Sequence, residues 1–151
     1  MPKLTILGSY GFLWIAVALI LLLDKRHRDC GIALALGLIS SVVIGNQILK
    51  NAVARPRPCW LVEGYDLLVN NPTDFSFPSG HTLAGFIAAT ILFNYNRKWG
   101  IVAYILAAVI GFSRLYLYVH FPTDVLAGVI LGICIGSLVS YFAFKKLLKK
   151  Q

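Results

Sequence analysis

Three short groups of polar residues carry the side chains best suited to chemistry on a phosphate. Each group adjoins a long apolar stretch, and the groups are Lys50-x6-Arg57-Pro58, Pro78-Ser79-Gly80-His81 and Ser113-Arg114-x5-His120-x3-Asp124. A phosphate ester resists attack because its oxygens are already negative, so clustered cations and aimed donors lower the barrier. Arginine binds two phosphate oxygens through its planar fork, whereas lysine acts as a movable point charge. Lys50, Arg57 and Arg114 therefore predict a cationic phosphate site.

The second group favours the start of a helix that binds an anion. A helix N-terminus offers unpaired N–H groups and a partial positive charge. Ser79 suits the N-cap, Gly80 removes bulk that would keep a ligand from the backbone, and His81 would stand beside the phosphate. The alternative is an ordinary capped helix with a histidine at the membrane interface. Lys50, Arg57 and Arg114 also have an alternative: each one, taken alone, can be an anchor at the membrane interface.

The third group supplies a candidate nucleophile. Pro122 suits the first turn of a helix, which places His120 just before that helix and Asp124 in its opening turn. A carboxylate there accepts a hydrogen bond from the imidazole, fixes its tautomer and leaves the other ring nitrogen free to attack phosphorus. His81 would protonate the departing oxygen and later activate water. A purely structural His–Asp bridge between helices is the alternative.

The spacing of metal-ligating residue types matches no magnesium, zinc or two-metal phosphatase site. We therefore expect metal-independent catalysis with no cofactor. Cys30, Cys59 and Cys134 have no metal-type spacing, and we expect no disulfide among them. Cys30 and Cys134 lie in apolar runs, where a small buried thiol is the expected role.

The composition is that of a membrane protein. Of the 151 residues 58% are hydrophobic and 13% charged, and the mean hydropathy is +0.77, well outside the soluble globular range. The net charge of +8 is not massed on one amphipathic element, so we expect no nucleic-acid partner. About 20 apolar residues cross a bilayer. Five segments predict an all-α bundle of five transmembrane helices in a single domain over residues 1–151, at about 4–23, 31–49, 79–93, 100–117 and 124–144.

The basic residues predict an orientation. If the five spans alternate, residues 24–30, 94–99 and 145–151 share one side, and these hold 9 of the 14 Lys and Arg residues. Because positive loops stay in the cytoplasm, we expect the N-terminus outside and the C-terminus inside. The three polar groups then lie on the extracytoplasmic face, in what we expect to be a bacterial plasma membrane.

Other polar and small residues support the three groups. The connection over residues 50–78 contains four prolines, and loops of this length are usually functional or disordered. Asn46 and Gln47 either orient Lys50 or form hydrogen bonds between helices. Glycines at spacing four in the last span predict a face for close helix packing, and they are Gly128, Gly132 and Gly136.

In order and spacing, the three groups resemble the signature of the type 2 phosphatidic acid phosphatase superfamily, which includes vanadium haloperoxidases and glucose-6-phosphatase-like enzymes. The resemblance spans about residues 46–136. It implies a helical bundle with its site near the outer leaflet, His120 as nucleophile, Asp124 as its partner and His81 as acid and base. It also implies a phosphate cradle of Lys50, Arg57, Ser79, Gly80 and Arg114. Ser113 belongs to the signature without a separate chemical role.

Membrane members of that superfamily usually have six spans, and this chain shows five. The resemblance therefore raises the expectation of an exposed flank, covered in a homodimer or used as a different route for lipid access.

Together these observations predict a membrane lipid-phosphate phosphatase that works through a phosphohistidine. Polyprenyl diphosphate, phosphatidylglycerol phosphate and phosphatidic acid all fit as substrates, and the resemblance favours the first two. The alternatives are a lipid phosphotransferase with the same intermediate, a vanadate-dependent peroxidase, and a non-catalytic protein that binds anionic lipids.

Overall fold

The computed structural model describes residues 11–62 and 72–148, and within these ranges all regular secondary structure is helical. The elements are α2 (Phe12–Leu23), α3 (Arg28–Ser40), the π-helical η2 (Ser41–Leu49), α4 (Lys50–Val53), the 3-10 turn η3 (Pro58–Trp60), α5 (Gly80–Tyr95), α6 (Arg97–Tyr116) and α7 (Pro122–Leu148). The backbone stays helical through Ser41 and Lys50, so α3, η2 and α4 form one rod. The described residues therefore contain five helical rods, as the sequence predicts. Residues 4–10 of the first predicted span lie outside the described residues.

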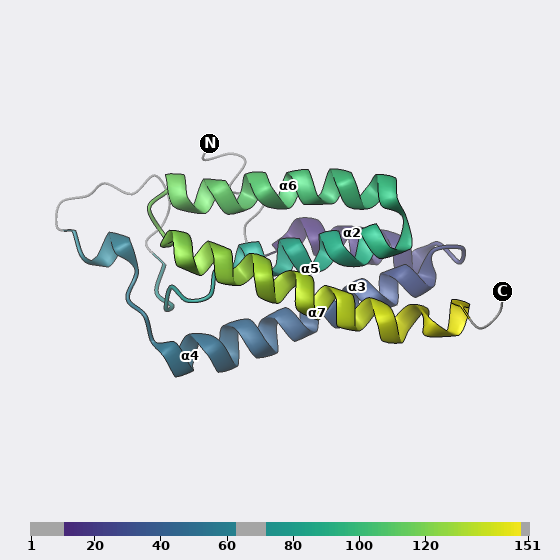
Figure 1. Ribbon diagram of the computed structural model, residues 1–151, viewed down its shortest axis with the longest axis horizontal. Helices are drawn as coiled ribbons and strands as arrows, with labels where there is room; N and C mark the ends of the chain where they lie inside the picture. Colours follow the sequence, from purple (N-terminus) through teal and green to yellow (C-terminus); the bar gives the residue numbers. More distant parts are fainter. Residues whose placement is uncertain (1–10, 63–71, 149–151) are drawn as a thin grey trace.

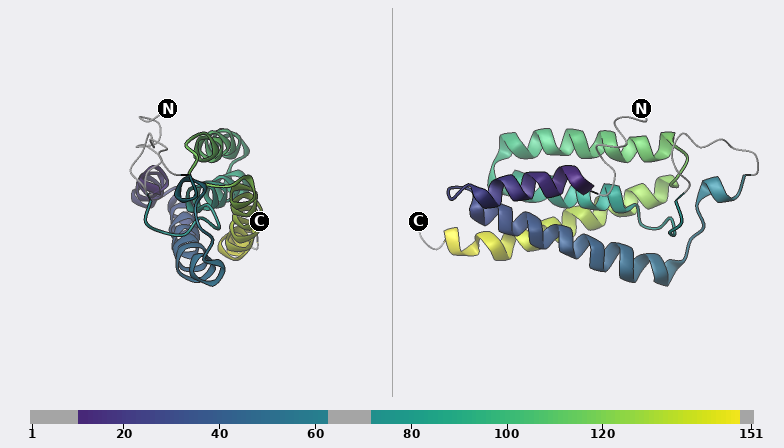
Figure 2. Two further views of the ribbon diagram at one scale, coloured as in Figure 1. Left: turned by 90° about the vertical axis from the view of Figure 1, so that its left-hand side faces the viewer. Right: turned by 180° about the vertical axis from the view of Figure 1, so that it is seen from behind.

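Helix α5 is the centre of the bundle (Figures 1 and 2), where α7, α6, α3 and α2 all pack against it. Leu83, Ile87 and Ile91 on α5 are completely buried. This helix is only 16 residues long and contains several small residues. Because lipid is as apolar as leucine, helices in a bilayer associate through close packing, which small side chains permit. A short, enclosed helix is thus positioned by its neighbours on nearly every side.

The glycine stripe of α7 lies directly on α5. A Cβ added at Gly132 would come within 2.6 Å of the Phe86 Cβ and 3.0 Å of the Leu83 carbonyl oxygen. At Gly136 the added atom would lie 2.7 Å from the Thr90 Cβ. The predicted close-packing face is confirmed, and it fixes α7 along the length of α5.

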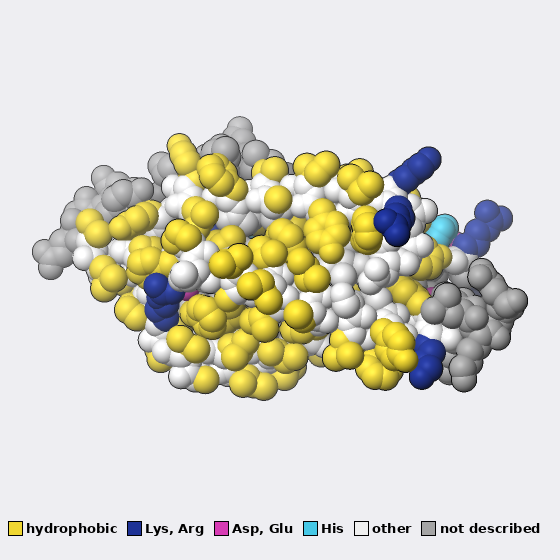
Figure 3. Space-filling view, viewed as in Figure 1, with side chains coloured by type: hydrophobic (Ala, Val, Ile, Leu, Met, Phe, Trp, Pro, Cys, Tyr) yellow, Lys and Arg dark blue, Asp and Glu magenta, His cyan; other side chains and the backbone are white. Residues whose placement is uncertain are grey.

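The bundle is that of an integral membrane protein. Among the residues that the structure describes, three segments are long and apolar enough to cross a bilayer, namely 28–60, 97–116 and 122–145, while Phe12–Leu23 is apolar but shorter. Figure 3 shows hydrophobic side chains over the middle of the visible face, with Lys and Arg toward both ends. An apolar surface between two polar ends matches a bilayer with water on either side.

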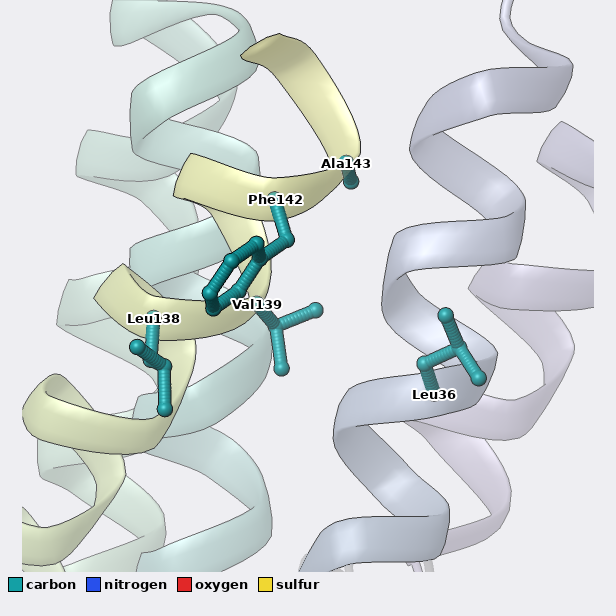
Figure 4. Close-up of a pocket in the computed structure, with 5 residues that line it drawn as sticks. All are labelled: Leu36, Leu138, Val139, Phe142 and Ala143. Atoms are coloured by element: carbon teal, nitrogen blue, oxygen red, sulfur yellow. The ribbon is translucent and has the colours of Figure 1, made fainter.

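One pocket on the flank of the bundle is apolar throughout. It has a volume of about 360 Å³ between α3 and α7 and is lined by Leu36, Leu138, Val139, Phe142 and Ala143 (Figure 4).

The prediction of a buried thiol is correct for Cys30 and wrong for Cys134. Cys134 lies on the outward face of α7, where a transmembrane helix carries apolar side chains whether or not they face protein, so apolar neighbours do not predict burial.

Candidate active site

The three polar groups meet at one end of the bundle, where the connection after α4 and the turn between α6 and α7 lie together (Figure 1). Two backbone hydrogen bonds join them. The Ser79 N–H donates to the Asp124 carbonyl at 3.1 Å, and the Ser76 N–H donates to the Arg55 carbonyl at 2.9 Å. The start of α5, the start of α7 and the segment after α4 are therefore tied to one another through main-chain atoms.

Arg57 connects the first group to the third. Its buried guanidinium donates to the Asp74 carbonyl through Nε at 2.7 Å and to the Val119 carbonyl through Nη1 at 2.8 Å. Nη1 also lies 3.2 Å from Nε2 of His120, and Nη2 donates to the Asp74 carboxylate at 2.7 Å. A planar fork with several donors suits this position, because each partner lies in a different direction.

Lys50 contacts the Asp74 carboxylate from a second direction. It is 6% exposed at the start of α4, and its ammonium forms an ion pair with Asp74. The π-helical turn that precedes it is a feature the sequence did not predict. Because a π-helix has a wider turn than an α-helix, η2 changes the direction in which the following residues point. Lys50 follows this wider turn directly.

His120 has one ring nitrogen toward a carboxylate and the other toward a cation. Its Nδ1 lies 3.6 Å from Oδ2 of Asp124 and makes no hydrogen bond, while Nε2 faces Arg57. Hydrogen bonds at catalytic groups are often long without substrate and shorten in the complex. Burial lowers the pKa of His120, and Arg57 acts in the same direction while Asp124 opposes it. The neutral imidazole, the form that has a lone pair to donate, is thereby favoured.

Asp124 is fully buried, and its carboxylate already accepts three hydrogen bonds. The donors are Oγ of Ser76 at 2.5 Å, the N–H of Phe121 at 2.8 Å and Nη1 of Arg55 at 2.8 Å. Arg55 also bonds Oγ1 of Thr123 at 2.6 Å. A buried carboxylate is stable only when it is paired and hydrogen-bonded. These partners hold Asp124 ionised and in place beside His120.

The residues at the start of α5 have partners that the sequence did not indicate. Ser79 occupies the N-cap position but makes no capping bond, and its hydroxyl accepts from Thr82 at 3.0 Å. A Cβ on Gly80 would lie 2.9 Å from Oδ1 of Asn46, so the missing side chain lets η2 approach α5. The Asn46 side chain therefore lies in the contact between these two helices.

His81 and Arg114 complete the set. His81 is half-buried and lies within electrostatic reach of Arg114, His120, Lys50 and Arg57. The buried Arg114 donates through Nε to Oγ of Ser113 at 3.3 Å, and Ser113 donates to the Ile110 carbonyl at 2.6 Å. Ser113, which had no assigned role, thus contacts the cation beside it.

The family model of the PAP2 superfamily matches residues 30–148 of this chain. The chain belongs to the PAP2 superfamily. Undecaprenyl-diphosphatase of Sulfolobus acidocaldarius is 39% identical over 135 residues, which cover 87% of this chain and 65% of that protein. The chain thus spans slightly less than two thirds of this relative's length.

Two crystal structures share the fold of this chain. The first transmembrane PAP2 type phosphatidylglycerolphosphate phosphatase from Bacillus subtilis matches with a TM-score of 0.74 and 30% identity, covering 95% of this chain and 74% of that one. Aquifex aeolicus LpxE matches with a TM-score of 0.77 and 31% identity, covering 91% and 81%. The predicted family and the helical membrane fold are confirmed.

Three residues of this PAP2 site were not among the predicted site residues, namely Arg55, Asp74 and Ser76. Each lies in the connection over residues 50–78, where polar side chains are ordinary and carry no periodic signal. One signal was present for Arg55, which lies two residues before Arg57 on the side with few cations. Asp74 and Ser76 lie shortly before the Pro78-Ser79-Gly80-His81 group, but only the folded connection shows what they contact.

Proposed function

We propose that this PAP2 protein is a lipid-phosphate phosphatase that removes the terminal phosphate of a polyprenyl diphosphate through a phosphohistidine on His120. The observation that carries the proposal is the orientation of the His120 ring. Nδ1 faces Asp124 at 3.6 Å, and Nε2 faces the guanidinium of Arg57 at 3.2 Å. A proton on Nδ1 leaves the Nε2 lone pair directed toward the cations that would hold phosphate.

In the first step, neutral His120 attacks phosphorus through Nε2. The N–P bond forms as the P–O bond to the lipid breaks, and the electron pair of that bond moves onto the departing oxygen. His81, which becomes protonated once the negative charge of the bound substrate lies beside it, gives its proton to this oxygen. Lys50, Arg57 and Arg114 stabilise the negative charge on the phosphoryl oxygens.

In the second step, water replaces the lipid. The now neutral His81 takes a proton from water, whose oxygen bonds to phosphorus as the N–P bond breaks and its electron pair returns to His120. Inorganic phosphate leaves, and His81 is again protonated. Asp124 stabilises the positive charge that His120 carries in both steps.

The substrate class rests on the relatives. The protein that is 39% identical is named undecaprenyl-diphosphatase, and a polyprenyl tail would stay in the bilayer while its diphosphate reaches the cationic end. Phosphatidylglycerol phosphate is the second substrate to test, because a phosphatidylglycerolphosphate phosphatase shares the fold.

The orientation and assembly belong to the same proposal. We place the active end on the extracytoplasmic face of a bacterial plasma membrane, with catalysis independent of metal and a homodimer as the candidate assembly. Cysteines introduced by Lys25→Cys and Thr73→Cys, in a chain without its native thiols, test the orientation. An impermeant thiol reagent added to intact cells should label Thr73→Cys alone, and labelling of Lys25→Cys instead would reverse the orientation.

Phosphate release from a panel of lipid phosphates, in detergent with a chelator present, tests the chemistry. His120→Ala should abolish release, whereas His27→Ala, a matched change at the opposite end, should leave it intact. Full turnover in His120→Ala would remove the assigned nucleophile, and loss of turnover with chelator would remove metal independence. Transfer of the phosphoryl group to an added acceptor lipid, with no release of inorganic phosphate, would favour the phosphotransferase instead.

A further inference from the structure

Asp74 lies where a phosphate anion would bind. One carboxylate oxygen pairs with the ammonium of Lys50, and the other accepts from Nη2 of Arg57 at 2.7 Å. A bound phosphoryl group would engage the same two cations, each through a different oxygen. The carboxylate of Asp74 therefore makes contacts that the proposed function assigns to the substrate.

The partners of this cluster differ in exposure. The side chains of Lys50 and Arg57 are 7% and 5% exposed, whereas that of Asp74 is 55% exposed. The side chains of Lys50 and Arg57 are thus buried, and the Asp74 carboxylate covers them on the solvent side. A carboxylate so exposed can leave for water at a much lower desolvation cost than the buried cations.

The backbone at Asp74 has its own attachment. Arg57 donates to the Asp74 carbonyl at 2.7 Å and approaches the Phe75 carbonyl at 3.4 Å. The Ser76 N–H donates to the Arg55 carbonyl, and the Ser76 hydroxyl donates to Asp124. These bonds do not involve the Asp74 carboxylate, so that group can rotate away while the segment stays attached.

We propose that the Asp74 carboxylate is a built-in placeholder that occupies the phosphate cradle at rest and is displaced when the substrate's phosphate binds. This inference rests on the proposed function, because it regulates the same site. Two buried cations without an anion would be costly, and Asp74 offsets that cost between turnovers. A phosphoryl group with more negative charge can displace it, whereas a singly charged anion competes on equal terms at best. The returning carboxylate also promotes release of inorganic phosphate.

The charge of Asp74 is present throughout the working pH range. Burial raises the pKa of this carboxyl, but Lys50 and Arg57 together outweigh burial and bring the pKa below its ordinary value. The competing anion is therefore always available near neutral pH.

Asp74→Asn tests the placeholder, with Asp24→Asn at the opposite end as the matched control. Binding of inorganic phosphate to the purified, full-length protein is measured by calorimetry, without turnover. An apparent Kd is the intrinsic value divided by the fraction of open sites, so a cradle occupied about nine-tenths of the time predicts about 10-fold tighter binding in Asp74→Asn. Inhibition by phosphate should strengthen in parallel in the turnover assay. Unchanged or weaker phosphate binding would overturn the proposal and make Asp74 a residue that positions the cations.

A second measurement does not depend on the folding of that variant. A fluorophore on Thr73→Cys, which is exposed beside Asp74, should respond to inorganic phosphate in a saturable manner when the carboxylate moves. No response at phosphate concentrations that saturate binding in the calorimetric experiment would overturn the placeholder. Both binding experiments run without a lipid substrate, so absence of lipid hydrolysis would count against the proposed function and not against this inference.

Discussion

The packing of α7 on α5 gives the sharpest stability prediction. At Gly132 an added Cβ would lie 2.6 Å from the Phe86 Cβ, and the Leu83 carbonyl oxygen would be 3.0 Å away. Carbon atoms in contact settle about 3.5 to 4.0 Å apart, so Gly132→Ala would force the two helices to separate locally by about 1 Å. Neither obstacle can move alone, because a Cβ and a carbonyl oxygen move with the backbone.

Overpacking of this kind costs about 1 to 3 kcal/mol. For a chain of this size each kcal/mol shifts Tm by about 2 to 4 °C, so Gly132→Ala should lower Tm by roughly 2 to 12 °C. Lipid-phosphate turnover should also fall, because α7 carries Asp124 and its main-chain bond to Ser79.

Thermal unfolding in detergent, followed by circular dichroism, measures the effect. Ser137→Ala is the matched control, since Ser137 is exposed on the same helix and its change should stay within about 0.5 kcal/mol. An unchanged Tm in Gly132→Ala would refute the close approach of α5 and α7. An equal loss in both variants would show that helix content, and not the contact, decides the outcome.

Three further predictions concern the active end. Arg57→Lys should reduce kcat/KM at least about 100-fold in the phosphate-release assay, because one ammonium replaces a fork with several partners, and a value near wild type would contradict this role. Burial lowers the pKa of His120 in the folded protein below its ordinary value of 6.5. In the unfolded chain the imidazole therefore binds a proton near pH 6.5, whereas in the folded protein it does so only at lower pH. Stability should therefore fall as the pH drops through 6.5 and level off below the folded pKa, and the loss of Tm between about pH 7 and about pH 5 should be smaller in His120→Gln. An equal loss in that variant would assign the acid sensitivity elsewhere. Ala54 has a left-handed backbone with φ of 47°, so Ala54→Gly should stabilise the end of α4 by up to about 1 kcal/mol, and a lower Tm would contradict that account.

The helical membrane architecture and the family follow from short-range information. Apolar runs of sufficient length predict membrane-spanning helices, because only a helix or a closed barrel satisfies its own backbone hydrogen bonds in lipid. The glycine spacing on α7 predicts close packing, because residues four apart share one helix face. Cys134 shows the limit of such patterns, since an apolar residue in a membrane helix can face either lipid or protein.

At the candidate site, too, the sequence predicts some features and only the folded structure shows the others. The types and spacing of Lys50, Arg57, His120 and Asp124 were enough to predict phosphate chemistry, because few reactions need cations beside a histidine and a carboxylate. Their mutual positions depend on a connection without periodicity, so the sequence was silent about which partner each one has. Asp74 pairs with two cations, and Ser76 and Arg55 donate to Asp124, only because the folded connection lies against the start of α7.

The sequence by itself therefore determined which groups are available and which medium surrounds the helices, since hydropathy and residue chemistry act over one or two turns. Tertiary structure alone decided that Nδ1 of His120 lies 3.6 Å from Asp124 without a hydrogen bond, and that Asp74 covers the cationic cradle. Those features depend on where helix ends and loops lie relative to one another, and close packing among distant segments fixes that arrangement.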